Sequence, residues 1–452
     1  MSRWLSYENG LSPGMPMTNR WVGAIKRLAG SGFLRSVSTL VSAGVAGQAI
    51  LLAIMPLITR LYTPADFGVA AVFGALMSTL LMASSLRYEM AIVLPRSDRQ
   101  AEVLMRLALI LTVSSAAVVL IIVAIWRTPI ARILRVPDME GLLWALPLAL
   151  VGAGAYRIFN FWAVRKEAFG QIARTRIWQS LANAATQLSI GILGSGPLGL
   201  ITGQVVGLAV GGKSLSRGAR VRARLDWAEW HRIRSAARQY ARFPKYDVPA
   251  ALVDTLSVQL PNLLLALLFS PAVAGWYMLA DRMILTPLSL ISQAVGQVVY
   301  AKSRDHVMQD SLLTSTAKIA GLLGLGVTAA GLIFVPLAPM LFDYIFGSQW
   351  ESAGLYSAIL FFGFAAQFVY SSISLTLPAT DGQHLNLVIH VILLVGKSLA
   401  LLYGYMQSSA LTAIVAFALA TFIGNVMAIA IILLHLRKCS TAAQALSSNG
   451  RV

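Results

Sequence analysis

Two related stretches decide the fold: LITRLYTPADFG at residues 57–68 and LLALLFSPAVAG at residues 264–275, 207 residues further along the chain. Five of their twelve aligned positions are identical. In each stretch a hydroxyl side chain, Thr63 or Ser270, stands directly before a proline. This pattern is typical of a helix N-cap followed by proline at the first helical position. Each stretch therefore predicts the end of one helix, a sharp turn and the start of the next.

Apolar blocks surround both stretches. Of the 452 residues, 57% are hydrophobic and 12% are charged, whereas a soluble domain has roughly 25% charged residues. The apolar residues gather in blocks of about 20, the length at which a helix crosses the hydrocarbon core of a bilayer. This composition excludes a soluble globular protein and predicts an all-α polytopic membrane protein.

Twelve such blocks follow one another, and each is long enough for one transmembrane helix. The first block follows an N-terminal segment at residues 1–35 and is too long for the apolar region of a secretory signal, so we expect it to remain as a span. The predicted spans are residues 36–58, 67–86, 104–126, 141–164, 174–193, 197–212, 247–269, 275–299, 317–341, 354–377, 385–404 and 411–434.

The two related stretches divide the spans into halves, because each stretch closes the first span of a set of six. The predicted organisation is a cytoplasmic N-terminal segment (1–35), a six-helix bundle (36–212), a basic cytoplasmic linker (213–246), a second six-helix bundle (247–434) and a cytoplasmic tail (435–452). Since six is even, the halves should share one orientation and be related by an axis along the membrane normal. Two unrelated short hairpins that use the same cap chemistry are the alternative.

Basic residues predict the orientation. With the N-terminus inside, the cytoplasmic segments hold 28 Lys and Arg residues and the outer loops hold four, which follows the positive-inside rule. We therefore expect both termini in the cytoplasm. The linker carries ten basic residues with two interleaved tryptophans, a pattern that favours an interfacial helix on anionic membrane lipid over a nucleic-acid site.

Three cations lie deep inside predicted spans: Arg157, Arg282 and Lys397. An ionisable group at this depth costs about 2.5 to 3.5 kcal/mol on insertion scales, so it needs a partner, water or a function. From the helical rise, Arg157 lies roughly 10 Å from the inner edge, Arg282 roughly 10 Å from the outer edge and Lys397 near the middle. We expect all three to line one cavity.

Further polar side chains share the helix faces of these cations or lie on neighbouring spans. These candidates are Asn160, Gln259, Asn262, Gln293 and His390. Faces this polar cannot all meet lipid, so we infer a wet cavity between the two halves. The alternatives are that Arg157 and Asn160 extend towards the inner headgroups and that His390 only forms a hydrogen bond between helices.

Few acidic residues lie at the same depth. Asp254 and Asp281 oppose the three cations, which leaves a net positive interior suited to a phosphate or diphosphate. Either carboxylate would alternatively be a packing counter-ion. The single cysteine, Cys439, excludes a disulfide within the chain. The sequence predicts no metal, no cofactor and no catalytic motif, so we expect a transporter rather than an enzyme.

The stretch LRYEMAIVLP at residues 86–95, together with residues 59–68, is similar to the bacterial polysaccharide biosynthesis family, the Wzx-like O-antigen flippases. The segment NFWAVR at residues 160–165 and the region 243–297 extend the resemblance over most of residues 36–434. The resemblance implies the MATE-like fold of the multidrug, oligosaccharidyl-lipid and polysaccharide exporter superfamily. In this fold two six-helix bundles surround a central cavity in the bacterial inner membrane.

The resemblance also implies a substrate, an oligosaccharide linked to polyprenyl diphosphate, which is moved to the outer leaflet for O-antigen, lipopolysaccharide or exopolysaccharide synthesis. Arg157 would receive the diphosphate, and Lys397 and Arg282 would hold it further out. A polysaccharide polymerase and chain-length proteins are the implied partners. A cation-coupled multidrug or metabolite exporter of the same superfamily is the alternative. The candidates for charge balance or coupling are Glu89, Asp254, Asp281 and His390.

Overall fold

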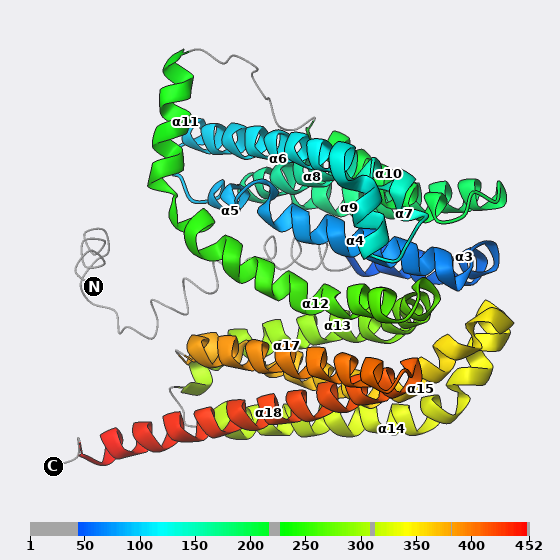
Figure 1. Cartoon of the computed structure of the whole chain (residues 1–452). Helices are drawn as coiled ribbons and strands as arrows, with labels where there is room; N and C mark the ends of the chain where they lie inside the picture. The colour runs from blue at the N-terminus through cyan, green and yellow to red at the C-terminus, as the bar shows by residue number, and fades with distance from the viewer. Residues whose placement is uncertain (1–43, 217–226, 308–311, 381, 450–452) are drawn as a thin grey trace.

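The computed structural model describes residues 44–216, 227–307, 312–380 and 382–449, and the regular elements there are all helical. The expected N-terminal segment at residues 1–35 lies outside the described residues, as does the beginning of the first predicted span. Figure 1 shows two layers of nearly parallel helices, one from each half of the chain.

The helices of the first half are the segment Gly44–Ala53, α3 (Met55–Leu61), α4 (Pro64–Ser84), α5 (Tyr88–Ala91), α6 (Asp98–Ile133), α7 (Met139–Leu142), α8 (Ala145–Arg165), α9 (Phe169–Ile192) and α10 (Leu198–Ser216). The linker contains α11 (Trp227–Gln239) and a π-helical turn (Phe243–Asp247). The second half contains α12 (Val248–Leu268), α13 (Pro271–Val307), α14 (Leu312–Phe346), a 3-10 turn (Ser348–Trp350), α15 (Glu351–Ile373), α16 (Thr376–Ala379), α17 (Gln383–Met406) and α18 (Ala410–Asn449).

Each predicted span coincides with helical structure. The first falls on the segment Gly44–Ala53 and α3, which bend by 41° relative to each other. Within the described residues, eight helices are long and apolar enough to cross a membrane, or nine if the bent pair forms one span. Helices α8, α9 and α13 fall outside that set, and each carries charged residues within its length. The prediction of an all-α polytopic membrane protein is confirmed.

Both predicted turns begin their helices with the expected caps. The Thr63 hydroxyl accepts a hydrogen bond from the backbone N–H of Asp66 at 3.2 Å, and the Asp66 carboxylate accepts one from the N–H of Thr63 at 2.8 Å. This reciprocal pair is a capping box. At the start of α13, the Ser270 hydroxyl accepts the N–H of Val273 at 3.3 Å. The caps satisfy backbone donors that would otherwise be unpaired at the start of a helix.

The two turns contact each other reciprocally. A Cβ atom at Gly68 would lie 1.7 Å from the carbonyl oxygen of Pro271, and one at Gly275 would lie 1.8 Å from that of Pro64. Because each glycine lacks a side chain, the first residue of the other helix packs directly against it. A contact across a two-fold axis has this pattern, in which each partner presents the same pair of positions. We call this end of the molecule, where the Pro64 and Pro271 turns meet, the turn end.

A cluster around Trp350 closes the turn end further. The Trp350 side chain is fully buried, and its ring lies 4.7 Å from that of Phe67 in an edge-on arrangement. Its Nε1 donates a hydrogen bond to the carbonyl oxygen of Thr59 at 2.9 Å, and Gln349 Nε2 donates to the same oxygen at 2.9 Å. Two side chains of the second half therefore bind the end of α3 in the first half.

Helices α4, α12 and α13 lie where the two layers meet (Figure 1). In addition to the turn contact, the Gln259 amide on α12 donates a hydrogen bond to the Ser78 hydroxyl on α4 at 2.7 Å. The packing of α4 against α12 and α13 joins the two halves, and the cavity described below lies beside this boundary, lined by residues of the second half.

A row of glycines at one-turn intervals follows one face of α10, and we call it the glycine ridge: Gly199, Gly203, Gly207 and Gly211. A Cβ atom at Gly211 would lie 2.1 Å from the Gln179 amide of α9. Small residues at this spacing let two membrane helices approach closely. The ridge fixes the polar face of α9 against α10.

At the opposite end, α11 crosses the ends of the long helices rather than running along them (Figure 1). We call this the linker end. The Tyr88 hydroxyl of α5 donates a hydrogen bond to the backbone oxygen of Ala237 in α11 at 2.9 Å. Ile233 of α11 is 3% exposed and joins the apolar cluster at this end of the first half. The linker helix is therefore docked on the first half.

Candidate functional site

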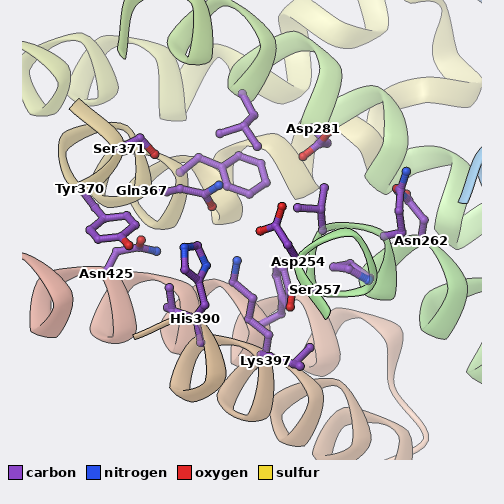
Figure 2. A pocket seen from close by; sticks show the side chains of 18 of the residues that line it. Asp254, Ser257, Asn262, Asp281, Gln367, Tyr370, Ser371, His390, Lys397 and Asn425 are labelled. Carbon is purple, nitrogen blue, oxygen red and sulfur yellow. The ribbon is translucent and has the colours of Figure 1, made fainter. Parts of the chain in front are cut away.

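A cavity of about 190 Å³ lies inside the second half, enclosed by α12, α13, α15, α17 and α18 (Figure 2). Ligand pockets typically measure roughly 300 to 1,000 Å³, so this one would hold part of a large ligand. Six of the residues predicted from the sequence line it: Asp254, Gln259, Asn262, Asp281, His390 and Lys397.

The charged residues enter the cavity from three helices. Figure 2 shows Lys397 and His390 rising from α17 into the space that Asp254 enters from α12. The Lys397 ammonium lies 5.7 Å from the centre of the Phe417 ring, a cation–π distance. Asp281 on α13 is near enough to attract Lys397. The cavity therefore combines one ammonium with two carboxylates.

Amide groups supply neutral hydrogen-bonding sites. Asn262 Nδ2 donates to Gln259 Oε1 at 3.4 Å, and Gln259 in turn donates to Ser78 of the first half. The Oδ1 atoms of Asn262 and Asn425 are buried and have no hydrogen-bond partner among the described residues. Buried polar atoms are normally paired, so these two acceptors point to a ligand or water in the cavity.

Six polar lining residues were not predicted from the sequence: Gln367, Tyr370 and Ser371 on α15, Asn425 on α18, Ser257 on α12 and Tyr277 on α13. The first and third are four residues apart and therefore share a helix face. Asn425 is the only Asn or Gln in the predicted span 411–434. The shared face of Gln367 and Ser371 and the isolated amide of Asn425 are both visible in the sequence, although neither involves a charged residue.

Arg157 lies in the first half, bound to Glu89. Its Nε is 3.0 Å from Glu89 Oε1, and the glutamate side chain is fully buried. The Ser85 hydroxyl also donates to this carboxylate. Between α4 and α5, Leu86 and Arg87 have φ angles of 49° and 63°, the left-handed region that non-glycine residues rarely occupy. This break ends α4 and turns Glu89 into the bundle.

Glu89 alters the predicted charge balance. From the sequence, Asp254 and Asp281 were counted against the three deep cations, which left a net positive interior, and Glu89 was named as a further candidate for charge balance. The structure adds Glu89, which is fully buried, as a third carboxylate beside Asp254 and Asp281. Among the described residues, the three predicted cations are therefore matched by three carboxylates, because the break before α5 places the glutamate of this short helix inside the bundle.

The first half has a neutral cavity of its own, with a volume of about 270 Å³. Gln179, Ser180 and Asn183 of α9 line it, together with Tyr156 of α8 and Gln204 of α10. The glycine ridge of α10 holds this polar face in place. The cavity offers amides and hydroxyls and no charged side chain among the described lining residues.

Besides Arg157 and Glu89, three further predicted residues line neither cavity. Asn160 follows Arg157 by one helical turn on α8, and its Oδ1 is buried without a described partner. Arg282 lies beside Asp281 on α13 and attracts it, and Gln293 lies further along that helix with its side chain exposed. A single path that joins the three deep cations stays a prediction.

Comparisons with known proteins agree with this architecture. A family described as "Polysaccharide biosynthesis protein" matches residues 57–354. No curated protein sequence matches the chain.

Among solved structures, the lipid II flippase MurJ in its inward closed conformation has a TM-score of 0.64 at 12% identity, over 89% of this chain and 90% of that chain. An inward-facing multidrug resistance MATE family transporter of the MOP superfamily has a TM-score of 0.53 at 14% identity, over 90% and 95% of the two chains. The Vibrio cholerae MATE transporter VcmN, as a point mutant, has a TM-score of 0.53 at 15% identity, over 90% and 96%. At these identities the likeness shows the fold alone, and the expected exporter fold is confirmed.

Proposed function

Because the chain belongs to the polysaccharide biosynthesis protein family, we propose that it is a flippase for oligosaccharides linked to polyprenyl diphosphate. It moves this substrate from the inner to the outer leaflet of the bacterial cytoplasmic membrane by alternating access. The product supplies O-antigen or exopolysaccharide synthesis, where a polysaccharide polymerase and chain-length proteins are its partners.

The chemistry of the second-half cavity carries the proposal. Amides such as Gln259, Asn262 and Gln367 both donate and accept hydrogen bonds, as sugar hydroxyls require. The rings of Tyr370 and Phe364 offer apolar faces to the C–H groups of a sugar. Several neutral amides, two of them with unpaired oxygens, suit a carbohydrate, and the small volume of the cavity suits one end of a larger head group.

Lys397 supplies the charge for the diphosphate in this mechanism. Its ammonium is a compact cation on a flexible stem, so it can follow a phosphate through a change of conformation. Arg157 would take part only after exchanging its partner, because its guanidinium is bound to Glu89. The arriving diphosphate would replace that carboxylate as the partner of the guanidinium.

Closure of the turn end supports an alternating mechanism. The contacts of Gly68 with Pro271, of Gly275 with Pro64, and of Trp350 with α3 seal one end of the boundary between the halves. We assign the turn end to the outer face, following the distribution of basic residues. The structure then corresponds to a state closed towards the outside, and transport requires these contacts to separate.

One observation favours the alternative, a cation-coupled multidrug or metabolite exporter. Asp254 and Asp281 both line the cavity, and a pair of carboxylates suits an organic cation. Lys397 opposes this interpretation, because its ammonium lies in the same cavity and would compete with a cationic substrate for both carboxylates.

Flipping of a fluorescent polyprenyl-diphosphate oligosaccharide in proteoliposomes tests the proposal. Replacing Lys397 with Gln should lower the rate about tenfold or more, because a hydrogen bond to a charged group contributes about 1.5 to 3 kcal/mol. Lys318→Gln is the matched control, since that lysine is exposed near the start of α14. A parental rate in Lys397→Gln would refute the role of Lys397. Transport of an organic cation without any flipping would establish the alternative.

A further inference from the structure

A basic cleft lies at the linker end, apart from both cavities, between the start of α6 and α11. Figure 1 shows where these two helices meet. The volume of the cleft is about 290 Å³. The polar residues that line it are Arg99, Gln100, Arg232, Ser235, Gln239 and Tyr240. The cleft thus combines two guanidinium groups with amides and hydroxyls.

The two arginines have no carboxylate partner among the described residues, although carboxylates lie nearby. Asp98 is already bound to Arg165, with 3.1 Å between Nε and Oδ1, and Glu102 forms its salt bridge one turn along α6. The cleft therefore holds two positive charges without a matching anion from the described chain. Two adjacent guanidinium groups with further donors form the kind of site that binds a phosphate group.

The cleft lies at the depth of lipid headgroups. Arg99 precedes the predicted span 104–126 by five residues, which places it about 7 Å beyond the hydrocarbon core along the helix. Helix α11 crosses the ends of the spanning helices (Figure 1), with Trp230 half-exposed and Ile233 buried against the first half. An amphipathic helix with exposed tryptophan and arginine is typical of the membrane interface.

We infer that the cleft between α6 and α11 binds the phosphate group of an anionic phospholipid from the leaflet at the linker end. Arg99 and Arg232 hold the phosphate from the two helices, and Gln100 and Gln239 donate hydrogen bonds to it. The exposed surface of Trp230 rests among the headgroups beside it. A lipid held in this way joins the linker helix to the first half.

The position of the cleft gives the bound lipid a structural consequence. Helix α11 is hydrogen-bonded to Tyr88 of α5, and the next residue is Glu89, the partner of Arg157. A phospholipid that fixes α11 on α6 therefore also fixes the short helix that carries this ion pair. The inference concerns lipid binding alone and does not depend on which substrate is transported.

Native mass spectrometry of the detergent-purified full chain tests the site, with phosphatidylglycerol and phosphatidylcholine as probes. The double variant Arg99→Gln, Arg232→Gln should bind phosphatidylglycerol about tenfold more weakly or worse, since it loses two charge-assisted contacts. The matched control is Arg96→Gln, Arg234→Gln, which removes two exposed charges of the same segments outside the cleft. This control should bind as the parent does.

Three outcomes would overturn the inference. Equal weakening in both double variants would mean that total charge, not the cleft, attracts the lipid. Equal binding of phosphatidylcholine and phosphatidylglycerol by the parent would remove the requirement for an anionic headgroup. Displacement of phosphatidylglycerol by millimolar inorganic phosphate would assign the cleft to a free phosphate instead. Thermal unfolding of each variant reports whether the fold is intact.

Discussion

Replacing Gly68 with alanine should weaken the closed contact between the two halves at the turn end. The added Cβ atom would lie 1.7 Å from the carbonyl oxygen of Pro271, and Cβ contacts below 3.0 Å essentially never occur. The neighbouring atom is backbone, so no side chain can rotate away. The two helices must therefore move apart locally, by about 1.3 Å if the whole shift is along this contact.

The energetic cost follows from this displacement. Overpacking a tight contact costs about 1 to 3 kcal/mol, and each 1.4 kcal/mol changes an equilibrium about tenfold. The balance between closed and open turn ends should thus shift about 5-fold to 150-fold towards the open state. This effect acts on the conformational equilibrium, because the contact exists only while the turn end is closed.

Accessibility of a single cysteine measures the shift. The chain has one cysteine, Cys439, so in a Cys439→Ser background a newly introduced cysteine is the only thiol that can react. Ser257 lines the second-half cavity, and Ser257→Cys should react faster with a membrane-impermeant thiol reagent from the turn end once Gly68 is alanine. Applying the reagent from each side in turn makes the result independent of the assigned orientation.

Two further variants decide whether the reasoning holds. Gly74→Ala lies on the same helix, where a Cβ would meet only the Gln204 amide at 3.9 Å, and should label as the parent does. Gly275→Ala should match Gly68→Ala, because its Cβ would lie 1.8 Å from the Pro64 oxygen. Equal labelling of Gly68→Ala and Gly74→Ala would refute the argument, and so would a Gly275→Ala variant that behaves like the parent.

The remaining predictions concern topology and the deep arginines. In the cysteine-free background, Ser214→Cys should label only from the cytoplasm and Ala65→Cys only from outside; outside labelling of Ser214→Cys would invert the orientation. Arg157→Ala should lower stability by about 3 to 5 kcal/mol because it leaves buried Glu89 unpaired, and adding Glu89→Gln should restore the melting temperature but not flipping. Arg282→Lys keeps the charge but loses the two-bond grip on a phosphate, so substrate affinity should fall in a binding assay; unchanged affinity would leave Arg282 as a counter-ion.

Local chemistry made most of the fold predictable. The caps at Thr63 and Ser270 depend on residues within one helical turn, so the sequence alone identified both turns. Span positions depend on apolar length, which the bilayer fixes independently of packing. The sequence did not predict that Gly68 and Gly275 lie at a direct contact between the halves. It showed only that the two glycines occupy equivalent positions in the repeat.

The candidate site was less predictable, because helical periodicity shows which residues share a face but not where that face points. His390 and Lys397 share a face of α17 and line one cavity. Arg282 and Gln293 share a face of α13 by the same rule and line neither described cavity. Glu89 reaches the interior through a left-handed break before α5, and periodicity carries no signal for such a break.

The two cavities differ in charge although they occupy related positions in the repeat. His390 follows Asn183 by 207 residues, the offset of the two turns, and each lines the cavity of its own half. At the same offset, Lys397 corresponds to Ile190 and Asp281 to Gly74. Among the described lining residues, charged side chains thus occur only in the second-half cavity, whereas the glycine contact at the turn end is shared equally. Under the proposed mechanism, Lys397 holds the substrate charge in the second-half cavity, whereas the contact that must open belongs to both halves. Variants of Gly68 and Gly275 should therefore behave alike, while charge variants in the second-half cavity have no equivalent in the first-half cavity.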